Sequence, residues 1–539
     1  MEKQTVAERI AALLRVHGVE HVFGVPSGDW LPYMEAFAAA GIEFVLVANE
    51  ASAGFMAAVY GWLRGVPGVC YGTFGPGATN LATGVGGAYL DRAPVIAFTS
   101  ETPDSALGRT KQMMIDHQEL FRPITKWTTR LNVANVDGIV HAAVREALAE
   151  YPGPVHIGLP SGIGDQPAGG GAAAAGLPAS AHTPAPDAVS RAVAAIRGAS
   201  RPVLAVGLSA IRPGVAATID ELSRRLAVPV VLTPMAKGML PEDHPWYAGV
   251  LFHALSDRVA ETHRQADLVI GVGYDPVEFD YESWMPTVPL IHIDPRPADI
   301  DRRAYPHVID VVGDIAPALD FLLAEDLPVA GWDMAALAER RRRMFADLEP
   351  RAGLFGPFAA ISILREELPE NGIMTCDVGA HTHLIGQAWR TPDPAAQLMS
   401  NGWSSMGFGV PSAIGAGIAR PDRPVVCVTG DGGFMMMAGE MATARRQGLP
   451  IVFVVLRDRA LGLIRIKQGR RGSVSDATIL EPDGDRSADF LFGVPVRSVS
   501  DADGYRRALR EALAAQEPTI IEAHIEISEY EETILRPHK

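Results

Sequence analysis

The chain has 539 residues, of which 48% are hydrophobic and 20% charged, so it is ordinary globular material with enough length for about three domains. Its formal net charge of −16 argues against a nucleic-acid-binding or anionic-membrane-binding surface. No apolar run is long enough to span a bilayer, no apolar leader opens the sequence, and Cys70, Cys376 and Cys427 lack metal-ligand spacing. We therefore expect a cytoplasmic protein with buried, reduced thiols.

Residues 1–165 alternate helix and strand signals, which predicts an α/β domain with a parallel sheet. Thr5 and Glu8 form a capping box at the start of an amphipathic helix. Glu50 stands where a predicted strand ends and a helix begins, at the ligand-binding edge of such a sheet. The strands predicted here are His21–Val25, Phe44–Val47, Pro94–Thr99 and Val155–Leu159.

Composition divides the rest of the chain. Residues 166–186 are Gly, Ala, Pro and Ser with almost no large apolar side chain, which predicts a linker. A second α/β domain follows over 187–330, with strands Pro202–Val206, Pro229–Leu232, Leu268–Gly273 and a closing strand Leu290–Asp294. An Arg-rich helix, Ala335–Met344, lies in the connection 331–356, and the third domain covers 357–539.

The third domain contains the most informative stretch. The pattern predicts a strand Val425–Thr429, a glycine-rich turn, a helix Phe434–Gln447 and a strand Ile451–Leu456. A strand–helix–strand unit of this length makes the two strands parallel. Asp431 and Asp458 therefore follow the carboxyl ends of neighbouring strands, where open parallel sheets bind ligands.

This pair of aspartates, with the glycines beside them, predicts a site for a metal ion and a phosphate group. Gly432 and Gly433 allow close approach of the backbone, and amides at a helix start suit a phosphate. Two carboxylates beside it suit Mg²⁺, which bridges to phosphate oxygens. A surface turn with two solvated aspartates is the alternative interpretation.

Gly430-Asp431-Gly432-Gly433, followed by a second acidic ligand 27 residues after Asp431, resembles the diphosphate motif of thiamine-diphosphate enzymes. The resemblance covers nearly the whole chain and is nearest to the acetolactate synthases. Most of that family has Asn-Asn where this chain has Arg457-Asp458; an Asp also occurs in the catabolic, flavin-free acetolactate synthases. The resemblance implies three doubly wound parallel-sheet domains: pyrimidine-binding, central and diphosphate-binding.

The resemblance also implies the cofactor ligands. Glu50 matches the glutamate that exchanges a proton with the aminopyrimidine ring, and Leu463 matches the apolar side chain that bends the cofactor, although Leu463 could equally be plain core. The remaining cofactor residues implied are Gly379, His381, Ser404, Met406, Asp431, Gly432 and Gly433, and the implied metal ligands are Asp431, Asp458 and Ala460. Relatives usually have Gly in place of Ser404.

Substrate contacts are implied more weakly. Gln112 lies in a stretch that resembles the loop placing a glutamine over the thiazolium in carboligases, although it could be an exposed loop amide. The substrate pocket would include Gly28, Asp29, Phe74 and Lys467. Lys467 could hold a substrate carboxylate or simply be solvated, and Asp29 could act as an acid–base group or repel an anionic acceptor.

The function expected from this resemblance is decarboxylation of a 2-oxo acid, pyruvate in the simplest case, with ligation to a second carbonyl, using thiamine diphosphate and Mg²⁺. No adjacent His-His pair occurs in the chain; pyruvate decarboxylases use such a pair to release aldehyde, so ligation is favoured. Alternatives are a benzoylformate-type or branched-chain 2-oxo acid decarboxylase, a carboligase for an unusual aldehyde or sugar, and a binding protein without turnover.

The segment Gly273–Trp284 resembles the catabolic synthases, so FAD is not expected. We expect a homodimer or homotetramer with active sites between subunits.

One internal similarity is independent of the resemblance. Asp91–Ser100 and Asp422–Gly430 share Asp-Arg, a Pro, an apolar strand and a Thr. This predicts that the first and third domains are copies of one design, with chance similarity between two parallel strands as the alternative.

Overall fold

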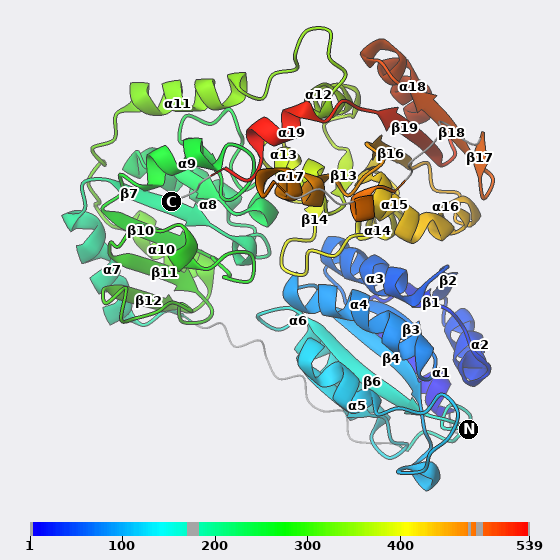
Figure 1. Ribbon diagram of the computed structural model, residues 1–539. Helices are drawn as coiled ribbons and strands as arrows, with labels where there is room; N and C mark the ends of the chain where they lie inside the picture. The colour runs from blue at the N-terminus through cyan, green and yellow to red at the C-terminus, as the bar shows by residue number, and fades with distance from the viewer. Residues whose placement is uncertain (1–3, 170–182, 473–475, 481–488, 537–539) are drawn as a thin grey trace.

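The computed structural model describes residues 4–169, 183–472, 476–480 and 489–536 and contains three α/β domains, each with its own sheet (Figure 1). In Figure 1 the central domain lies on the left, the C-terminal domain at the upper right and the N-terminal domain at the lower right. The expected fold class is confirmed. The precise domain boundaries stay a prediction, and most of the proposed linker, residues 170–182, lies outside the described residues.

The N-terminal sheet has six parallel strands in the order β2-β1-β3-β4-β6-β5. Its strands are β1 (His21–Gly24), β2 (Glu43–Leu46), β3 (Gly68–Gly72), β4 (Val95–Glu101), β5 (Trp127–Arg130) and β6 (Pro154–Pro160). Its helices are α1 (Val6–Val16), α2 (Leu31–Ala39), α3 (Glu50–Arg64), α4 (Pro76–Leu90), α5 (His117–Phe121) and α6 (Val136–Leu148). The capping box of Thr5 and Glu8 is formed, and the four predicted strands are present.

The central sheet has the order β12-β11-β10-β7-β8-β9, which is 3-2-1-4-5-6 when numbered from its first strand, the order found in dinucleotide-binding folds. Its strands are β7 (Pro202–Val206), β8 (Val230–Leu232), β9 (Tyr247–Val250), β10 (Leu268–Val272), β11 (Leu290–Asp294) and β12 (Val308–Val312). Its helices are α7 (Pro186–Gly198), α8 (Ala216–Leu226), α9 (Ser256–His263) and α10 (Ile315–Ala324), and α11 (Met334–Ala346) follows. The prediction that the domain closes with β11 was wrong: β12 pairs with β11 in parallel and extends the sheet.

The C-terminal sheet has the order β14-β13-β15-β16-β19-β18-β17. Its strands are β13 (Ile373–Cys376), β14 (Gln397–Met399), β15 (Val425–Gly430), β16 (Val452–Arg457), β17 (Phe490–Leu491), β18 (Val494–Val499) and β19 (Thr519–His524). Its helices are α12 (Pro357–Glu367), α13 (Ala380–Ala388), α14 (Gly409–Ala419), α15 (Asp431–Met437), α16 (Met441–Arg446), α17 (Gly462–Arg470), α18 (Ala502–Ala514) and α19 (Ser528–Thr533).

The helix predicted over 434–447 differs from the structure in two ways. It starts at Asp431, so Gly432 and Gly433 form its first turn rather than a separate loop. It is also interrupted by a 3₁₀ turn, Ala438–Glu440, between α15 and α16. Two consecutive glycines lower helix propensity, which is why the sequence alone places the helix start too late.

The first six strands of the C-terminal sheet repeat the N-terminal order, because β13, β14, β15, β16, β18 and β19 occupy the places of β1 to β6. The two outer domains therefore share one topology, as the internal similarity predicted. The matched segments are not equivalent, however. Asp91–Ser100 leads into β4, whereas Asp422–Gly430 leads into β15, which occupies the place of β3.

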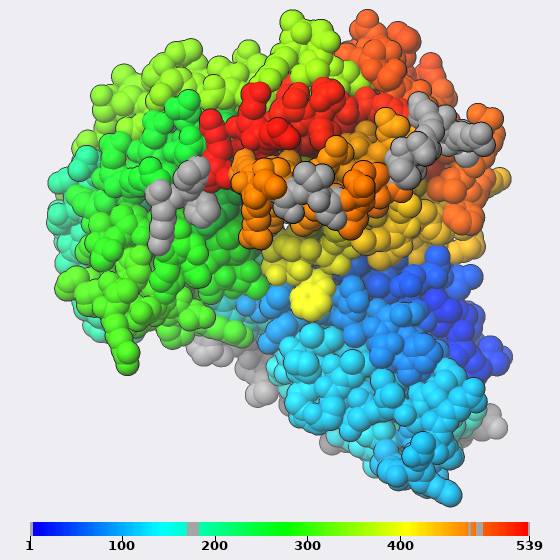
Figure 2. Space-filling view, viewed as in Figure 1, coloured from blue at the N-terminus to red at the C-terminus, as the bar shows by residue number. Residues whose placement is uncertain are grey.

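The outer domains pack through α3 and α14 (Figure 1). Gly415 of α14 lies against the backbone of Met56 of α3, where a Cβ would overlap it. The C-terminal segment lies across the surface between the central domain and α17 (Figure 2): Arg470 of α17 donates to the Ile534 carbonyl at 2.8 Å, and Ser256 of the central domain donates to the Arg536 carbonyl at 2.9 Å. No helix in the described ranges is both long and apolar enough to cross a membrane.

Candidate functional site

Two carboxylates lie at the carboxyl ends of β15 and β16. These strands pair in parallel with Gly430 opposite Leu456, so Asp431 and Asp458 each follow the end of a neighbouring strand, as predicted. The amide of Arg459 donates to Asp431 Oδ2 at 2.6 Å. Burial, and then the charge of Asp431, raise the pKa of Asp458 to about 7. The two carboxylates bring negative charge and hard oxygen donors close together. A divalent cation such as Mg²⁺ would neutralise that charge.

The loop after β16 presents Asp458 and Ala460. The amide of Ala460 donates to Asp458 Oδ1 at 3.0 Å. Ala460 forms an isolated antiparallel bridge with Ile479. The two hydrogen bonds of that bridge use the Arg459 carbonyl and the Leu461 amide, so the Ala460 carbonyl lies outside this pairing, as a metal ligand at this position requires.

The glycines of the first turn of α15 have different surroundings from those expected. The Gly432 amide donates to Asp431 Oδ1 at 2.8 Å, so it positions the carboxylate instead of pointing at a ligand. A Cβ at Gly433 would overlap the carboxylate of Asp377. Gly433 is therefore required by packing, and the prediction of a free amide at Gly432 is revised.

Asp377, at the end of β13, is a buried residue that sequence reasoning missed. Its carboxylate accepts from the Gly407 amide at 2.9 Å and from Thr429 Oγ1 at 3.0 Å. Burial raises its pKa to about 6. Its place directly after an apolar strand, the same signal that marked Asp431 and Asp458, could have identified it.

Gly379 and His381 form the start of α13. A Cβ on Gly379 would come within 2.7–2.8 Å of the His381 ring, so glycine lets the ring fold back toward β15. Burial lowers the pKa of His381 to about 4, and its Nε2 is buried without a hydrogen-bond partner in the described part of the chain. An unsatisfied buried nitrogen next to the carboxylates is a place for an added oxygen ligand.

The loop 401–407 contains Ser404 and Met406. Ser404 has φ +51°, in the left-handed region that favours glycine, so serine keeps the backbone conformation that glycine would adopt. Its Oγ donates to the Asn401 carbonyl at 2.8 Å. The Met406 methyl lies 3.2 Å from where a Cβ on Gly432 would be, so this loop borders the carboxylate pair.

Two buried acids from the other domains fasten this loop, and neither was predicted. Asp91 Oδ1 at the end of α4 accepts from the amides of Gly402 at 2.9 Å and Trp403 at 3.2 Å. Glu278 of the central domain accepts from Asn401 Nδ2 at 3.3 Å. Burial raises the pKa of Asp91 to about 6 and that of Glu278 to about 7. The loop is therefore fixed by all three domains of one chain.

Glu50 is the first residue of α3 and is 8% exposed. Its Oε2 accepts from Asn80 Nδ2 at 3.1 Å, and its Oε1 lies 3.2 Å from where a Cβ on Gly77 would be. The amides of Ala48 and Asn49, just before it, donate to Glu440 of the C-terminal domain at 3.0 and 3.2 Å. The predicted position at a strand end and helix start is confirmed.

Glu101, His117 and His156 form a buried cluster whose ligand-type atoms lie within 4.8 Å of one another. The Gly75 amide donates to His117 Nε2 at 3.2 Å. An amide can only donate, so His117 Nδ1 carries the hydrogen and donates to Thr99 Oγ1 at 2.9 Å, and Thr99 donates to His156 Nε2 at 2.8 Å. Burial lowers the pKa of His117 to about 4. The cluster is therefore a hydrogen-bonded relay of neutral imidazoles that holds Gly75.

The relay supports two elements that contain predicted substrate residues. Gly75 follows the partly buried Phe74, and a Cβ on Gly75 would meet the Met113 carbonyl at 2.6 Å. The neighbouring Gln112 is exposed on this loop. His117 thus contacts the turn that joins Phe74 and the Gln112 loop.

Comparison with known proteins identifies the family. Family models described as thiamine pyrophosphate enzyme, N-terminal TPP binding domain, central domain and C-terminal TPP binding domain match residues 4–120, 189–322 and 377–523. A probable acetolactate synthase large subunit of Methanocaldococcus jannaschii is 31% identical, over 97% of this chain and 92% of the relative. The chain belongs to the thiamine pyrophosphate enzyme family. An acetolactate synthase of Bacillus subtilis is 30% identical over 98% of this chain, and a probable 2-ketoarginine decarboxylase of Pseudomonas aeruginosa is 31% identical over 96%.

The residues present fit the cofactor of a thiamine pyrophosphate enzyme. A cation would neutralise the adjacent carboxylates of Asp431 and Asp458, and the buried Nε2 of His381 has no hydrogen-bond partner among the described residues. Both lie at the carboxyl edge of the C-terminal sheet, beside the loop of Ser404 and Met406. Thiamine diphosphate with a divalent ion would fit both features.

The remaining predicted residues of this thiamine pyrophosphate enzyme lie in separate places. Gly28 is exposed, and Asp29 Oδ1 beside it accepts from Ser161 Oγ at 2.5 Å. Leu463 is partly buried on α17, packed against the core. Lys467 is exposed on the same helix, and its charge adds to burial in lowering the pKa of His383 to about 4. Gly28, Asp29 and Phe74 belong to the N-terminal domain, and Lys467 to the C-terminal domain.

Proposed function

We propose that this thiamine pyrophosphate enzyme uses Mg²⁺ and thiamine diphosphate to decarboxylate pyruvate, or a similar 2-oxo acid, and to join the remaining fragment to a second carbonyl. The observation that carries the proposal is the carboxylate pair Asp431 and Asp458 beside the loop of Ser404 and Met406, in a chain whose relatives include acetolactate synthases. When bound, thiamine diphosphate supplies the electron sink for loss of CO₂ from a 2-oxo acid.

The chain's own residues would bind and position. Asp431, Asp458 and the Ala460 carbonyl would hold the cation, and His381 would donate from Nε2–H to a diphosphate oxygen. Met406 and Ser404 would hold the pyrimidine through their backbone, and Leu463 would pack against the cofactor. Glu50, whose Oε2 is fixed by Asn80, holds the proton exchanged with the pyrimidine ring.

Ligation is favoured over release of an aldehyde by the state of the histidines near the N-terminal strand ends. His117 and His156 are buried, neutral and hydrogen-bonded through Thr99. Both imidazoles are held in this hydrogen-bonded chain and are uncharged, so neither is an imidazolium acid that could protonate a carbanion. Gln112 on the exposed loop and Phe74 on the turn below it are the residues we place next to the acceptor carbonyl.

A homodimer or homotetramer, with sites completed by a second subunit, is part of the proposal. Met435 and Met436 on α15, next to Asp431, are each 56% exposed, and exposed apolar side chains beside a site favour a covering partner.

We propose that FAD is not used. Tyr274 and Tyr281 stack with their ring centroids 4.2 Å apart after β10, and Trp284 donates to the Tyr274 hydroxyl, so this segment fills the sheet edge with its own aromatic side chains. The cytoplasmic location and the absence of nucleic-acid and membrane partners stay predictions from composition.

Product analysis tests the proposal. Purified protein is incubated with pyruvate, thiamine diphosphate and Mg²⁺, and 2-acetolactate and acetaldehyde are quantified together. We expect 2-acetolactate as the main product, lost when either cofactor is omitted. Acetaldehyde as the dominant product would refute ligation.

A second candidate, simple decarboxylation of a longer 2-oxo acid, is favoured by one observation: the relative named as a probable 2-ketoarginine decarboxylase is as similar as the synthases. Asp29, held by Ser161 in the N-terminal domain, would suit a cationic substrate end. The same assay run across pyruvate, branched-chain 2-oxo acids, benzoylformate and 2-ketoarginine separates the two, because a decarboxylase releases one aldehyde per CO₂.

A further inference from the structure

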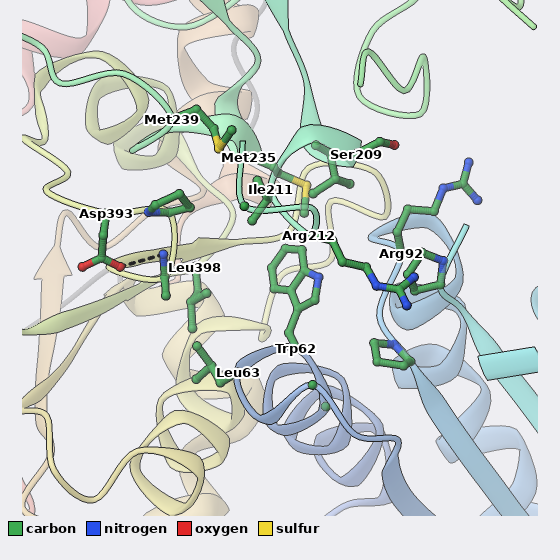
Figure 3. Close-up of a pocket in the computed structure, with 18 of the residues that line it drawn as sticks. Trp62, Leu63, Arg92, Ser209, Ile211, Arg212, Met235, Met239, Asp393 and Leu398 are labelled. Carbon is green, nitrogen blue, oxygen red and sulfur yellow. Dashed lines mark hydrogen bonds between the residues drawn. The ribbon is translucent and has the colours of Figure 1, made fainter. Parts of the chain in front are cut away.

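A cavity of about 480 Å³ lies where the three domains meet (Figure 3). The N-terminal domain contributes Trp62 and Leu63 from α3, the central domain Ile211 and Met235, and the C-terminal domain Leu398 of β14. This volume is in the range of small-molecule sites. The cavity is separate from Asp431, Asp458 and Glu50, none of which lines it.

The walls of this junction cavity are mainly apolar, and the charged residues among them are Arg92, Arg212, Glu150 and Asp393. In Figure 3 the Trp62 ring rises from α3 into the cavity with Ile211, Met235 and Leu398 around it, and Arg212 extends beside the ring. An elongated or ring-shaped apolar body would replace water against these side chains, which is the favourable part of binding.

The two arginines of the cavity are not equivalent. Arg92 is held by Asp275 at 2.6 Å, and the Asp275 side chain is 1% exposed, so its charge is neutralised in place. Arg212 pairs with Glu150 at 3.0 Å, with side chains 46% and 44% exposed. Such an exposed pair contributes little to stability, so Arg212 can bond a carboxylate of a ligand at small cost.

From these walls we propose that the junction cavity binds a monocarboxylic acid with an apolar ring or branched body, and that this ligand regulates cofactor binding. The body lies against Trp62 and Leu398, and the carboxylate bonds Arg212.

Three short connections join the cavity to the cofactor loop 401–407. The Met235 amide donates to Glu278 at 2.9 Å, and Glu278 accepts from Asn401. Asp91, the residue just before Arg92 in the sequence, accepts hydrogen bonds from the amides of Gly402 and Trp403. β14, which contributes Leu398 to the cavity wall, ends two residues before Asn401. A ligand that fixes these walls therefore stabilises the loop in the conformation seen here.

The direction of the effect follows from linkage. A ligand that stabilises the loop raises affinity for the cofactor, and the cofactor raises affinity for the ligand by the same factor. This coupling rests on the cofactor-binding role proposed for Ser404 and Met406, whereas binding in the cavity does not.

The test uses naphthalene-1-acetate as the probe, measured on the full-length protein by calorimetry and by thermal shift, with thiamine diphosphate affinity measured with and without it. Two variants address the cavity: Leu63→Trp fills it, and Arg212→Gln removes the cation. Arg197→Gln is the matched control, because Arg197 pairs with Glu325 at the same 3.0 Å, with exposures of 49% and 45%, elsewhere in the central domain.

We expect one probe per chain, loss of binding in Leu63→Trp, about fivefold weaker binding in Arg212→Gln, unchanged binding in Arg197→Gln, and at least about fivefold tighter cofactor binding with the probe present. Absence of binding at millimolar probe, or equal binding in all variants, overturns the site. Equal loss in both arginine variants also overturns it, since only bulk charge would be at work. Cavity binding that leaves cofactor affinity unchanged overturns the regulation, and a protein that binds the probe but no thiamine diphosphate overturns the proposed function alone.

Discussion

Asp458→Asn tests the carboxylate pair through stability as well as through binding. In the protein without metal, burial and the charge of Asp431 raise the pKa of Asp458 from 3.8 to about 7. An acid whose pKa is raised on folding destabilises the folded state once the unfolded chain ionises. The penalty is absent below pH about 4, grows as the pH rises to about 7 and is constant above.

A pKa rise of about 3 corresponds to about 4 kcal/mol at pH 8. Water reaching the partly exposed carboxylate lowers this, so we expect metal-free Asp458→Asn to be more stable than the parent protein by about 2–4 kcal/mol at pH 8 and equally stable at pH 4. With Mg²⁺ and thiamine diphosphate present the order reverses, because only the parent protein gains stability from bound ligand.

The assay is denaturant unfolding of both metal-free proteins from pH 4 to pH 8, repeated with saturating cofactors. The control is Asp422→Asn: Arg420 lowers the pKa of this exposed carboxyl to about 2, so its removal brings no gain as the pH rises. If Asp458→Asn shows no gain between pH 5 and 8, the two carboxylates are not crowded and the reasoning fails.

Three further substitutions have defined outcomes. Glu50→Gln should reduce kcat by at least about 100-fold with an unchanged melting temperature, and an unchanged kcat would remove Glu50 from the mechanism. His117→Phe leaves the Gly75 amide without its acceptor, at a cost of about 1–3 kcal/mol; thermal unfolding and a raised KM should both report it, and a parent-like KM would contradict the positioning role. Gly433→Ala places a methyl group on the Asp377 carboxylate, which should cost about 1–3 kcal/mol and weaken thiamine diphosphate binding; calorimetry showing parent-like affinity would contradict it.

Much of the fold could be predicted because helices and strands alternate along an α/β domain, and each has its own spacing of hydrophobic residues. Capping signals at Thr5 and strand ends at Asp431 and Asp458 are local, so the sequence contains them. The sequence analysis did not predict strands β3, β5, β9, β13, β14, β17, β18 and β19, and it excluded β12 by closing the central domain at β11. The place of a strand in a sheet depends on neighbours far along the chain. The late start predicted for α15 reflects helix propensity, which tertiary contacts at Gly433 override.

The site was predictable only where its residues follow strands. Asp91 and Glu440 accept hydrogen bonds from backbone amides of another domain, and Glu278 accepts one from the side-chain amide of Asn401. No spacing in the sequence relates an acid to an amide in another domain. The hydrogen-bonded relay from Gly75 through His117 depends in the same way on residues that are far apart in the sequence and come together only in the folded chain. The sequence alone therefore does not reveal it.

The most direct test of the account is the position of Mn²⁺, used in place of Mg²⁺, by anomalous diffraction from crystals grown with thiamine diphosphate. The account predicts one ion per chain bonded to Asp431 and Asp458, with a diphosphate oxygen as a further ligand. An ion at Glu101, His117 and His156, or no density between the two aspartates, would contradict it.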